Sequence, residues 1–172
     1  NALGFVFYEK SPRYIAPQDA KKIIAKLPPF IEKVALFVNV EADVINNYMQ
    51  ISGASLAQIH FDAPQEMYKH LQVPYIKVVR AKNKQDILKY NDEYRLVDAY
   101  CKSYGGAGKR INIEWFEGVD CSKIILAGGL NETNVSSLKK YNFYGVDVSS
   151  GVEISEGKKD SKKVKDFILN AH

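Results

Sequence analysis

The chain has 172 residues, 46% of them hydrophobic, so it can bury a substantial core and is expected to form one domain, residues 1–172. Its formal net charge of +4 comes mainly from lysines scattered along the chain, a pattern that argues against a nucleic-acid surface. No apolar run reaches membrane length, no signal peptide is visible, and the two cysteines are too few for a disulfide framework. We expect a globular, cytoplasmic protein with neither a nucleic acid nor a membrane as partner.

The first half of the chain alternates apolar strands with amphipathic helices. Continuous apolar runs predict strands buried on both faces at residues 2–8, 33–38, 55–60 and 73–79. Helical spacing predicts helices at residues 17–27, 41–51 and 64–71. Pro17 suits the first position of a helix, and Gly53 is a typical helix terminator.

The second half repeats this alternation. Strands are predicted at residues 94–98, 123–127 and 144–148. Helical segments are predicted at residues 82–90, near Trp115, at 134–141 and from a cap at Asp160 onward. Seven βα units follow from the whole pattern.

The position of the small residues favours one of two α/β architectures. Seven parallel units fit either an open doubly wound sheet or most of a (βα)8 TIM barrel. The last two strands run into Gly128-Gly129 and Ser149-Ser150-Gly151, and paired loops there are typical of barrel phosphate sites. Because a barrel has eight units, we expect a TIM barrel whose first β-strand and helix are absent from the 172 residues, with the domain incomplete at its N-terminus.

These two loops predict a phosphate site. Free backbone N–H groups at Gly128, Gly129, Ser149 and Ser150 can bind an anion, and glycine lets the chain approach phosphate oxygens closely. The alternative is that small residues only make tight turns after strands.

Two aspartates follow or interrupt predicted strands. Asp98 ends a strand, where barrels display catalytic groups, and apolar surroundings that raise its pKa enable a carboxyl group to protonate a leaving oxygen. A cap or an ion pair is the alternative role. Asp147 lies between two valines, so it is expected to point into the barrel mouth or to make structural hydrogen bonds.

Four further side chains are candidates for chemistry. The Arg13 guanidinium can hold a carboxylate through two parallel hydrogen bonds, or it is a solvated loop residue. His60 ends a strand and either lines the substrate or satisfies backbone carbonyls. Cys101 and Cys121 are expected to be incidental reduced thiols without metal-ligand spacing.

Taken together, these motifs resemble one family, the phosphoribosylanthranilate isomerases of tryptophan biosynthesis. They occur in the family's order and span nearly the whole chain. The motifs are Lys10-Ser-Pro-Arg-Tyr14, Leu27-Pro-Pro-Phe30, Gln58-Ile-His60, Val97-Asp98, Tyr104-Gly-Gly-Ala-Gly-Lys109, Leu126-Ala-Gly-Gly-Leu130 and Val146-Asp-Val-Ser-Ser-Gly-Val-Glu153 with Gly157-Lys-Lys-Asp160.

The resemblance implies a reaction and a set of roles. It implies an Amadori rearrangement of N-(5-phosphoribosyl)anthranilate, a small phosphorylated substrate, without metal or cofactor, by a monomer or homodimer. Asp98 would be the general acid and Arg13 the group that holds the anthranilate carboxylate. His60 and Asp147 would contact the substrate. The phosphate ligands implied are Gly106, Gly128, Gly129, Ser149 and Ser150.

One departure from the family is serious. The family's general base is a cysteine in a Lys-Ile-Cys-Gly motif on its first strand, and neither Cys101 nor Cys121 lies in such a motif. We therefore expect the 172-residue chain to be inactive alone. Two alternatives stay open: a non-catalytic phosphate-ester-binding fragment that needs a partner chain, and an indole-glycerol-phosphate synthase, for which Lys77 is the only loose catalytic candidate.

Overall fold

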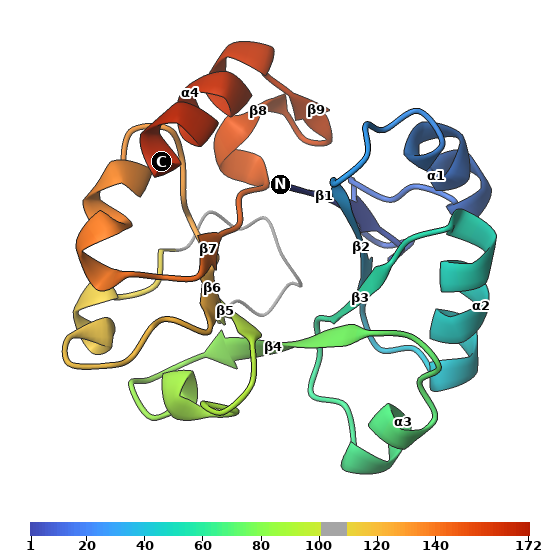
Figure 1. The fold of residues 1–172 in the computed structure, drawn as a ribbon, viewed down its shortest axis with the longest axis horizontal. Helices are drawn as coiled ribbons and strands as arrows, with labels where there is room; N and C mark the ends of the chain where they lie inside the picture. The colour runs from blue at the N-terminus through green and yellow to red at the C-terminus, as the bar shows by residue number, and fades with distance from the viewer. Residues whose placement is uncertain (101–109) are drawn as a thin grey trace. The chain divides into compact units, whose positions relative to one another are not determined.

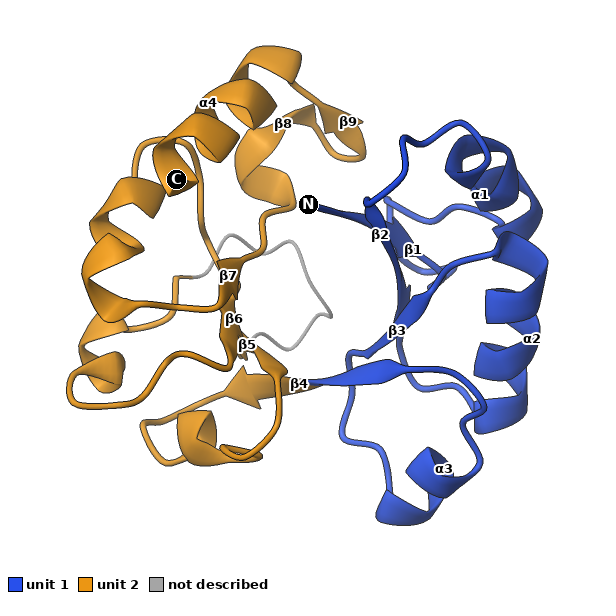
Figure 2. Cartoon of the chain, viewed as in Figure 1, with its two compact units in different colours: residues 1–77 blue, residues 78–172 orange. Residues whose placement is uncertain are grey.

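A computed structural model describes residues 1–100 and 110–172 of the chain. These residues form two compact units, residues 1–77 and residues 78–172 (Figure 2). The boundary falls inside strand β4 (Tyr75–Ala81), so this strand begins in the first unit and ends in the second. That the whole chain is one domain stays a prediction.

The first unit carries three complete βα repeats (Figure 1). The predicted start of α1 at Pro17 is confirmed, and α2 is terminated as predicted by Gly53 in the left-handed conformation, at φ +74°. α1 and α3 end two or three residues earlier than the sequence predicts. Phe7 packs edge-to-face on Phe37 and on Tyr48 of α2, which ties strands to helix. The elements are β1 (Ala2–Val6), α1 (Pro17–Ile24), β2 (Glu32–Phe37), α2 (Ala42–Ser52), β3 (Leu56–Ile59) and α3 (Gln65–Lys69).

Strand β1 differs from the expectation of burial on both faces. Phe5 and Phe7 are buried, but the first three strand residues are exposed, and Leu3 keeps 40% of its surface accessible. β1 stands first in the strand order and pairs with β2, and along its other long edge Val6 alone is bridged, to Tyr14, among the described residues. An edge strand buries less of its surface than a central one.

In the second unit, the last two strands of the main sheet and the first helical segment are shorter than predicted. After β4 come β5 (Arg95–Ala99), β6 (Ile124–Leu126) and β7 (Gly145–Val146), joined by 3₁₀ turns rather than α-helices. Around residue 86 the side chains of Asn83 and Asp86 accept backbone N–H groups, and such local bonds compete with a regular helix. The turns are η1 (Asp86–Leu88), η2 (Ile113–Phe116), η3 (Val135–Tyr141) and η4 (Ser150–Val152).

A short hairpin before the last helix is absent from the sequence-based expectation. β8 (Glu153–Ser155) and β9 (Lys158–Lys159) pair antiparallel, and Gly157 turns between them at φ +77°. The expected cap is confirmed: the Asp160 carboxylate accepts the N–H groups of Lys162 and Lys163 at the start of α4 (Ser161–Ala171). Within the described ranges no helix is both long and apolar enough to cross a membrane.

The main sheet follows chain order from β1 to β7. Neighbouring strands from β1 to β4 and from β5 to β7 pair in parallel. Parallel strands that follow one another in this way place their carboxyl ends on one edge, so β5, β6 and β7 all end at the same edge of the sheet.

Candidate active site

Asp98 lies in β5 and touches the loop after β6. A Cβ atom built on Gly128 would lie 2.8 Å from the Asp98 Oδ1 and 3.0 Å from the Ala99 nitrogen. Gly128 also has φ +93°, a conformation that side-chain-bearing residues rarely adopt. Glycine is therefore required here by both space and backbone geometry, and it brings the main chain against the carboxyl group.

The loops after β6 and β7 are in direct contact. A Cβ atom on Gly151, in η4, would overlap the carbonyl oxygen of Leu130. The Asn134 side chain donates to the Gly129 carbonyl oxygen at 3.0 Å and holds the first loop from its other side. The two small-residue loops that the sequence singles out thus lie side by side within the second unit.

The Asp98 carboxyl group has a strongly raised pKa. Its pKa is about 6, first because burial disfavours the charged form and second because the Asp147 charge lies nearby. A hydrogen bond from the Ala99 N–H and the charge of Arg80 partly oppose this rise. A carboxyl group with this pKa retains a protonated fraction near neutral pH and can donate a proton.

Asp147 follows β7 and interacts electrostatically with Asp98. Its N–H donates to the Leu126 carbonyl oxygen at 2.8 Å, which continues the β6–β7 ladder by one residue. The side chain is accessible to solvent, yet protein atoms crowd around it, and this partial loss of hydration raises its pKa while the Lys159 charge opposes the rise. Asp147 is therefore a second carboxyl group of this region, and its charge disfavours ionisation of Asp98.

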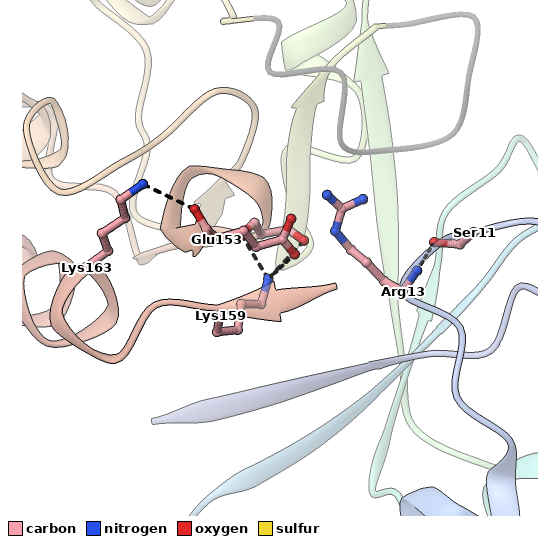
Figure 3. Close-up of polar contacts among 6 residues, drawn as sticks. Ser11, Arg13, Glu153, Lys159 and Lys163 are labelled. Carbon is pink, nitrogen blue, oxygen red and sulfur yellow. Dashed lines mark hydrogen bonds and ion pairs between the residues drawn. The ribbon is translucent and has the colours of Figure 1, made fainter. Parts of the chain in front are cut away.

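Lys159 of β9 holds the start of the loop after β7 (Figure 3). Its Nζ donates to the Ser149 carbonyl oxygen at 2.8 Å and lies 2.9 Å from the Glu153 Oε1. Ser150 follows at the start of η4. Ser149 and Ser150, two of the residues expected to bind phosphate, therefore belong to a loop that the Lys159–Glu153 ion pair holds in place.

Arg13 and His60 belong to the first unit. The Arg13 N–H donates to the Ser11 Oγ at 3.2 Å in the loop after β1 (Figure 3). His60 is buried after β3, and its Nδ1 lies 3.3 Å from the Gln58 Nε2. In this contact the Gln58 amide nitrogen is the donor and the Nδ1 is the acceptor. The structure groups the site residues of the second unit and leaves these two in the first.

The remaining candidates fall into two groups. Gly106 and Cys101 lie outside the described residues. Cys121 is buried, its Sγ donates to the Val119 carbonyl oxygen, and burial raises its pKa to about 11, so it stays a thiol at neutral pH. Lys77 is buried within β4 with its ammonium group over the Tyr68 ring.

The sequence-based reasoning missed three residues of this region. Arg80, near the end of β4, acts electrostatically on Asp98. The sequence feature that could have indicated its role is that the chain has only four arginines. Gly151 is the point at which the two loops touch. The sequence feature that could have indicated this is its position directly after Ser149 and Ser150. Lys159 is one of four lysines between residues 158 and 163, so the sequence does not single it out.

The fold and the placement of these residues define a class. Acidic side chains and glycine loops gather where β5, β6 and β7 end, an arrangement typical of enzymes with the TIM-barrel type of parallel α/β fold. In such folds, small-residue loops after the last strands are a common phosphate site.

Comparison with known proteins identifies the family within this class. A family model described as N-(5'-phosphoribosyl)anthranilate isomerase matches residues 1–170. The isomerase of Sulfurovum sp. is 58% identical over 171 residues, covering 99% of this chain and 87% of that protein.

Two solved isomerase structures agree with this match. The phosphoribosyl anthranilate isomerase of Thermotoga maritima superposes with a TM-score of 0.90 at 38% identity, covering 99% of this chain and 87% of that one. A second solved isomerase, in complex with reduced 1-(o-carboxyphenylamino)-1-deoxyribulose 5-phosphate, gives a TM-score of 0.82 at 36% identity, covering 99% of this chain and 86% of that one. The chain belongs to the N-(5'-phosphoribosyl)anthranilate isomerase family.

Proposed function

We propose that this protein catalyses the conversion of N-(5-phosphoribosyl)anthranilate to 1-(2-carboxyphenylamino)-1-deoxyribulose 5-phosphate in tryptophan biosynthesis. The observation that carries the proposal is the Asp98 carboxyl group, which lies against Gly128 with its pKa raised to about 6. A relative in the same family has been solved with a reduced form of that reaction's product.

In the proposed reaction Asp98 is the general acid. Its carboxyl proton goes to the ribose ring oxygen as the bond between this oxygen and C1 breaks, which leaves a protonated Schiff base between C1 and the anthranilate nitrogen. A base then removes the proton from C2, and tautomerisation of the resulting enol gives the ketone. A carboxyl group with a pKa near 6 suits the first step because it is both protonated often enough and acidic enough at neutral pH.

The other residues bind the substrate. Backbone N–H groups of the two adjoining loops receive the phosphate, with Gly128 and Gly129 on one loop and Ser149 and Ser150 on the other. Gly106 is proposed as a further phosphate ligand. On the first unit, Arg13 takes the anthranilate carboxylate through its guanidinium group. The remaining two substrate contacts are assigned to His60 and Asp147.

We also propose that residues 1–172 alone do not turn over substrate. The reaction needs a base for the C2 proton, and the family's base is a cysteine in a Lys-Ile-Cys-Gly motif that these residues lack. Cys121 does not substitute, because it is buried and its pKa is raised to about 11. A base must be available in its deprotonated form to act near neutral pH.

The test compares two proteins by the loss of substrate fluorescence. One is the 172-residue chain, and the other, the extended protein, is the same chain preceded by a βα unit that carries Lys-Ile-Cys-Gly. We expect turnover by the extended protein only, and none when its motif cysteine is changed to serine. Absence of turnover by the extended protein would favour the non-catalytic binder, whereas turnover by the 172-residue chain would refute the need for the added cysteine.

The role of Asp98 is tested in the extended protein. Asp98→Asn removes the proton donor and keeps the shape of the side chain, so kcat is expected to fall by at least about 1,000-fold. Binding of the reduced product analogue should change by less than about threefold. A loss of binding with unchanged kcat would instead assign Asp98 a structural role.

A further inference from the structure

The loop after β7 is held by an ion-paired network outside the residues assigned to the reaction (Figure 3). Lys159 and Glu153 face one another across the β8–β9 hairpin as a cross-strand pair. The Lys159 Nζ also donates to the Ser149 carbonyl oxygen at 2.8 Å, and the Lys163 Nζ donates to the Glu153 carbonyl oxygen at 3.1 Å. The network therefore connects the hairpin and α4 to the first residue of the phosphate loop.

This pair differs from an ordinary surface ion pair. The Glu153 side chain is only 4% exposed, whereas the Lys159 side chain is 45% exposed. A buried carboxylate needs a partner, since removing it from water without one is strongly unfavourable. Glu153 thus restrains the ammonium group of Lys159, and the Ser149 carbonyl group lies within reach of that restrained position.

The bond to the Ser149 carbonyl oxygen also orients a donor. The Ser149–Ser150 peptide is trans, so its C=O and its N–H point in opposite directions. The carbonyl oxygen receives Lys159 at 2.8 Å and the Val152 N–H at 3.5 Å, both from the side of the hairpin and η4. The Ser150 N–H consequently points away from them, out of the start of η4.

We propose that Lys159 is a positioning residue that orients the Ser150 N–H toward the substrate phosphate. The inference rests on the proposed function and extends it. It explains how a loop of small residues keeps the Ser150 N–H pointing in one direction although its own side chains are too small to fix it by packing. Lys159 acts through the Ser149 carbonyl group and not through its own contact with phosphate. The charge of Lys159 also opposes the rise in the pKa of Asp147, so the same lysine acts on a second proposed substrate contact.

The experiment measures phosphate binding and the loop together in the 172-residue chain. Ribose 5-phosphate and inorganic phosphate are titrated into ¹⁵N-labelled protein, and affinity and the shift of the Ser150 amide signal are followed by NMR. For Lys159→Met we expect at least a tenfold loss of affinity and loss of the ligand-induced Ser150 shift. Lys159→Arg should restore most of both, and Lys158→Met, at the exposed neighbouring position, should stay within threefold of the parent chain.

Three outcomes would overturn the inference. The first is an unchanged affinity in Lys159→Met. The second is a weakened affinity with the Ser150 shift intact, which would indicate a direct lysine–phosphate contact. The third is absence of phosphate binding by the parent chain. Because Lys159→Met removes the Lys159 ammonium group from beside the buried Glu153, the double variant Lys159→Met/Glu153→Gln is measured alongside, and it should show the same loss while remaining folded. The isomerase function is judged separately, by turnover of the extended protein.

Discussion

At the scale of single residues, the acid of this site is expected to reduce the stability of the fold. The pKa of Asp98 is about 6 in the folded chain against an ordinary value of 3.8, so the folded state prefers the protonated carboxyl group. Its contribution to stability is fully present below pH 3.8 and is lost as the pH rises through 6. The group that suits proton donation is thus unfavourable to the fold near neutral pH, as is common at catalytic positions.

The loss of stability with rising pH that Asp98 causes leads to a prediction for Asp98→Asn. An amide does not titrate, so the variant should gain stability relative to the parent chain as the pH rises. The gain in unfolding free energy should be on the order of 1 to 2 kcal/mol larger at pH 8 than at pH 5. Urea unfolding at both pH values measures it, with the exposed Asp92→Asn as control. Equal gains at the two pH values would contradict the raised pKa.

A second residue-scale prediction concerns Asp147. Its negative charge is the second cause of the raised pKa of Asp98, after burial. In the extended protein, kcat/KM should fall about tenfold per pH unit above pH 6 as Asp98 loses its proton. Asp147→Asn should move this fall in kcat/KM to lower pH, because the variant lacks the negative charge that helps to raise the pKa of Asp98. Asp120→Asn, an exposed carboxylate elsewhere in the unit, should leave this fall at the same pH.

At the scale of elements, the contact between the two loops depends on Gly151. A methyl group there overlaps the backbone carbonyl of Leu130, and backbone cannot move aside as the end of a side chain can. Gly151→Ala should lower the unfolding free energy by about 1–3 kcal/mol and weaken ribose 5-phosphate binding. Gly4→Ala is the control, since a Cβ atom built there meets no atom within 4 Å and its effect should stay within about 1 kcal/mol. Denaturant unfolding and ligand titration measure both variants, and equal effects would argue against the loop contact.

Particular elements show what local pattern predicts and where it stops. Pro17, Gly53 and Asp160 mark helix boundaries through their own backbone or side-chain chemistry, and all three predictions are confirmed. The segments at 82–90 and 134–141 have helical spacing but form 3₁₀ turns. In the first segment, side-chain to backbone bonds that depend on the folded loop compete with the helix.

At the scale of the whole molecule, β1 exposes part of one long edge in the 172-residue chain. This strand pairs with β2, and Leu3 is 40% exposed. An unpaired strand edge is a template for pairing with another chain. We expect the 172-residue chain to form larger species as its concentration rises, whereas the extended protein should keep one fixed mass, as a monomer or a homodimer. Light scattering over a concentration series measures this, and a fixed mass for both proteins would contradict the expectation.

The sequence by itself determined the alternation of strands and helices, the family resemblance and the choice of Asp98 and the two glycine and serine loops. These depend on residue type, spacing and order, which the chain carries locally. Only the tertiary structure decided that Gly128 touches the Asp98 carboxyl group, that Gly151 joins the two loops and that Lys159 fastens Ser149. These contacts and the raised pKa of Asp98 depend on burial and on distances between residues up to 49 positions apart, as for Asp98 and Asp147, and no local pattern encodes them.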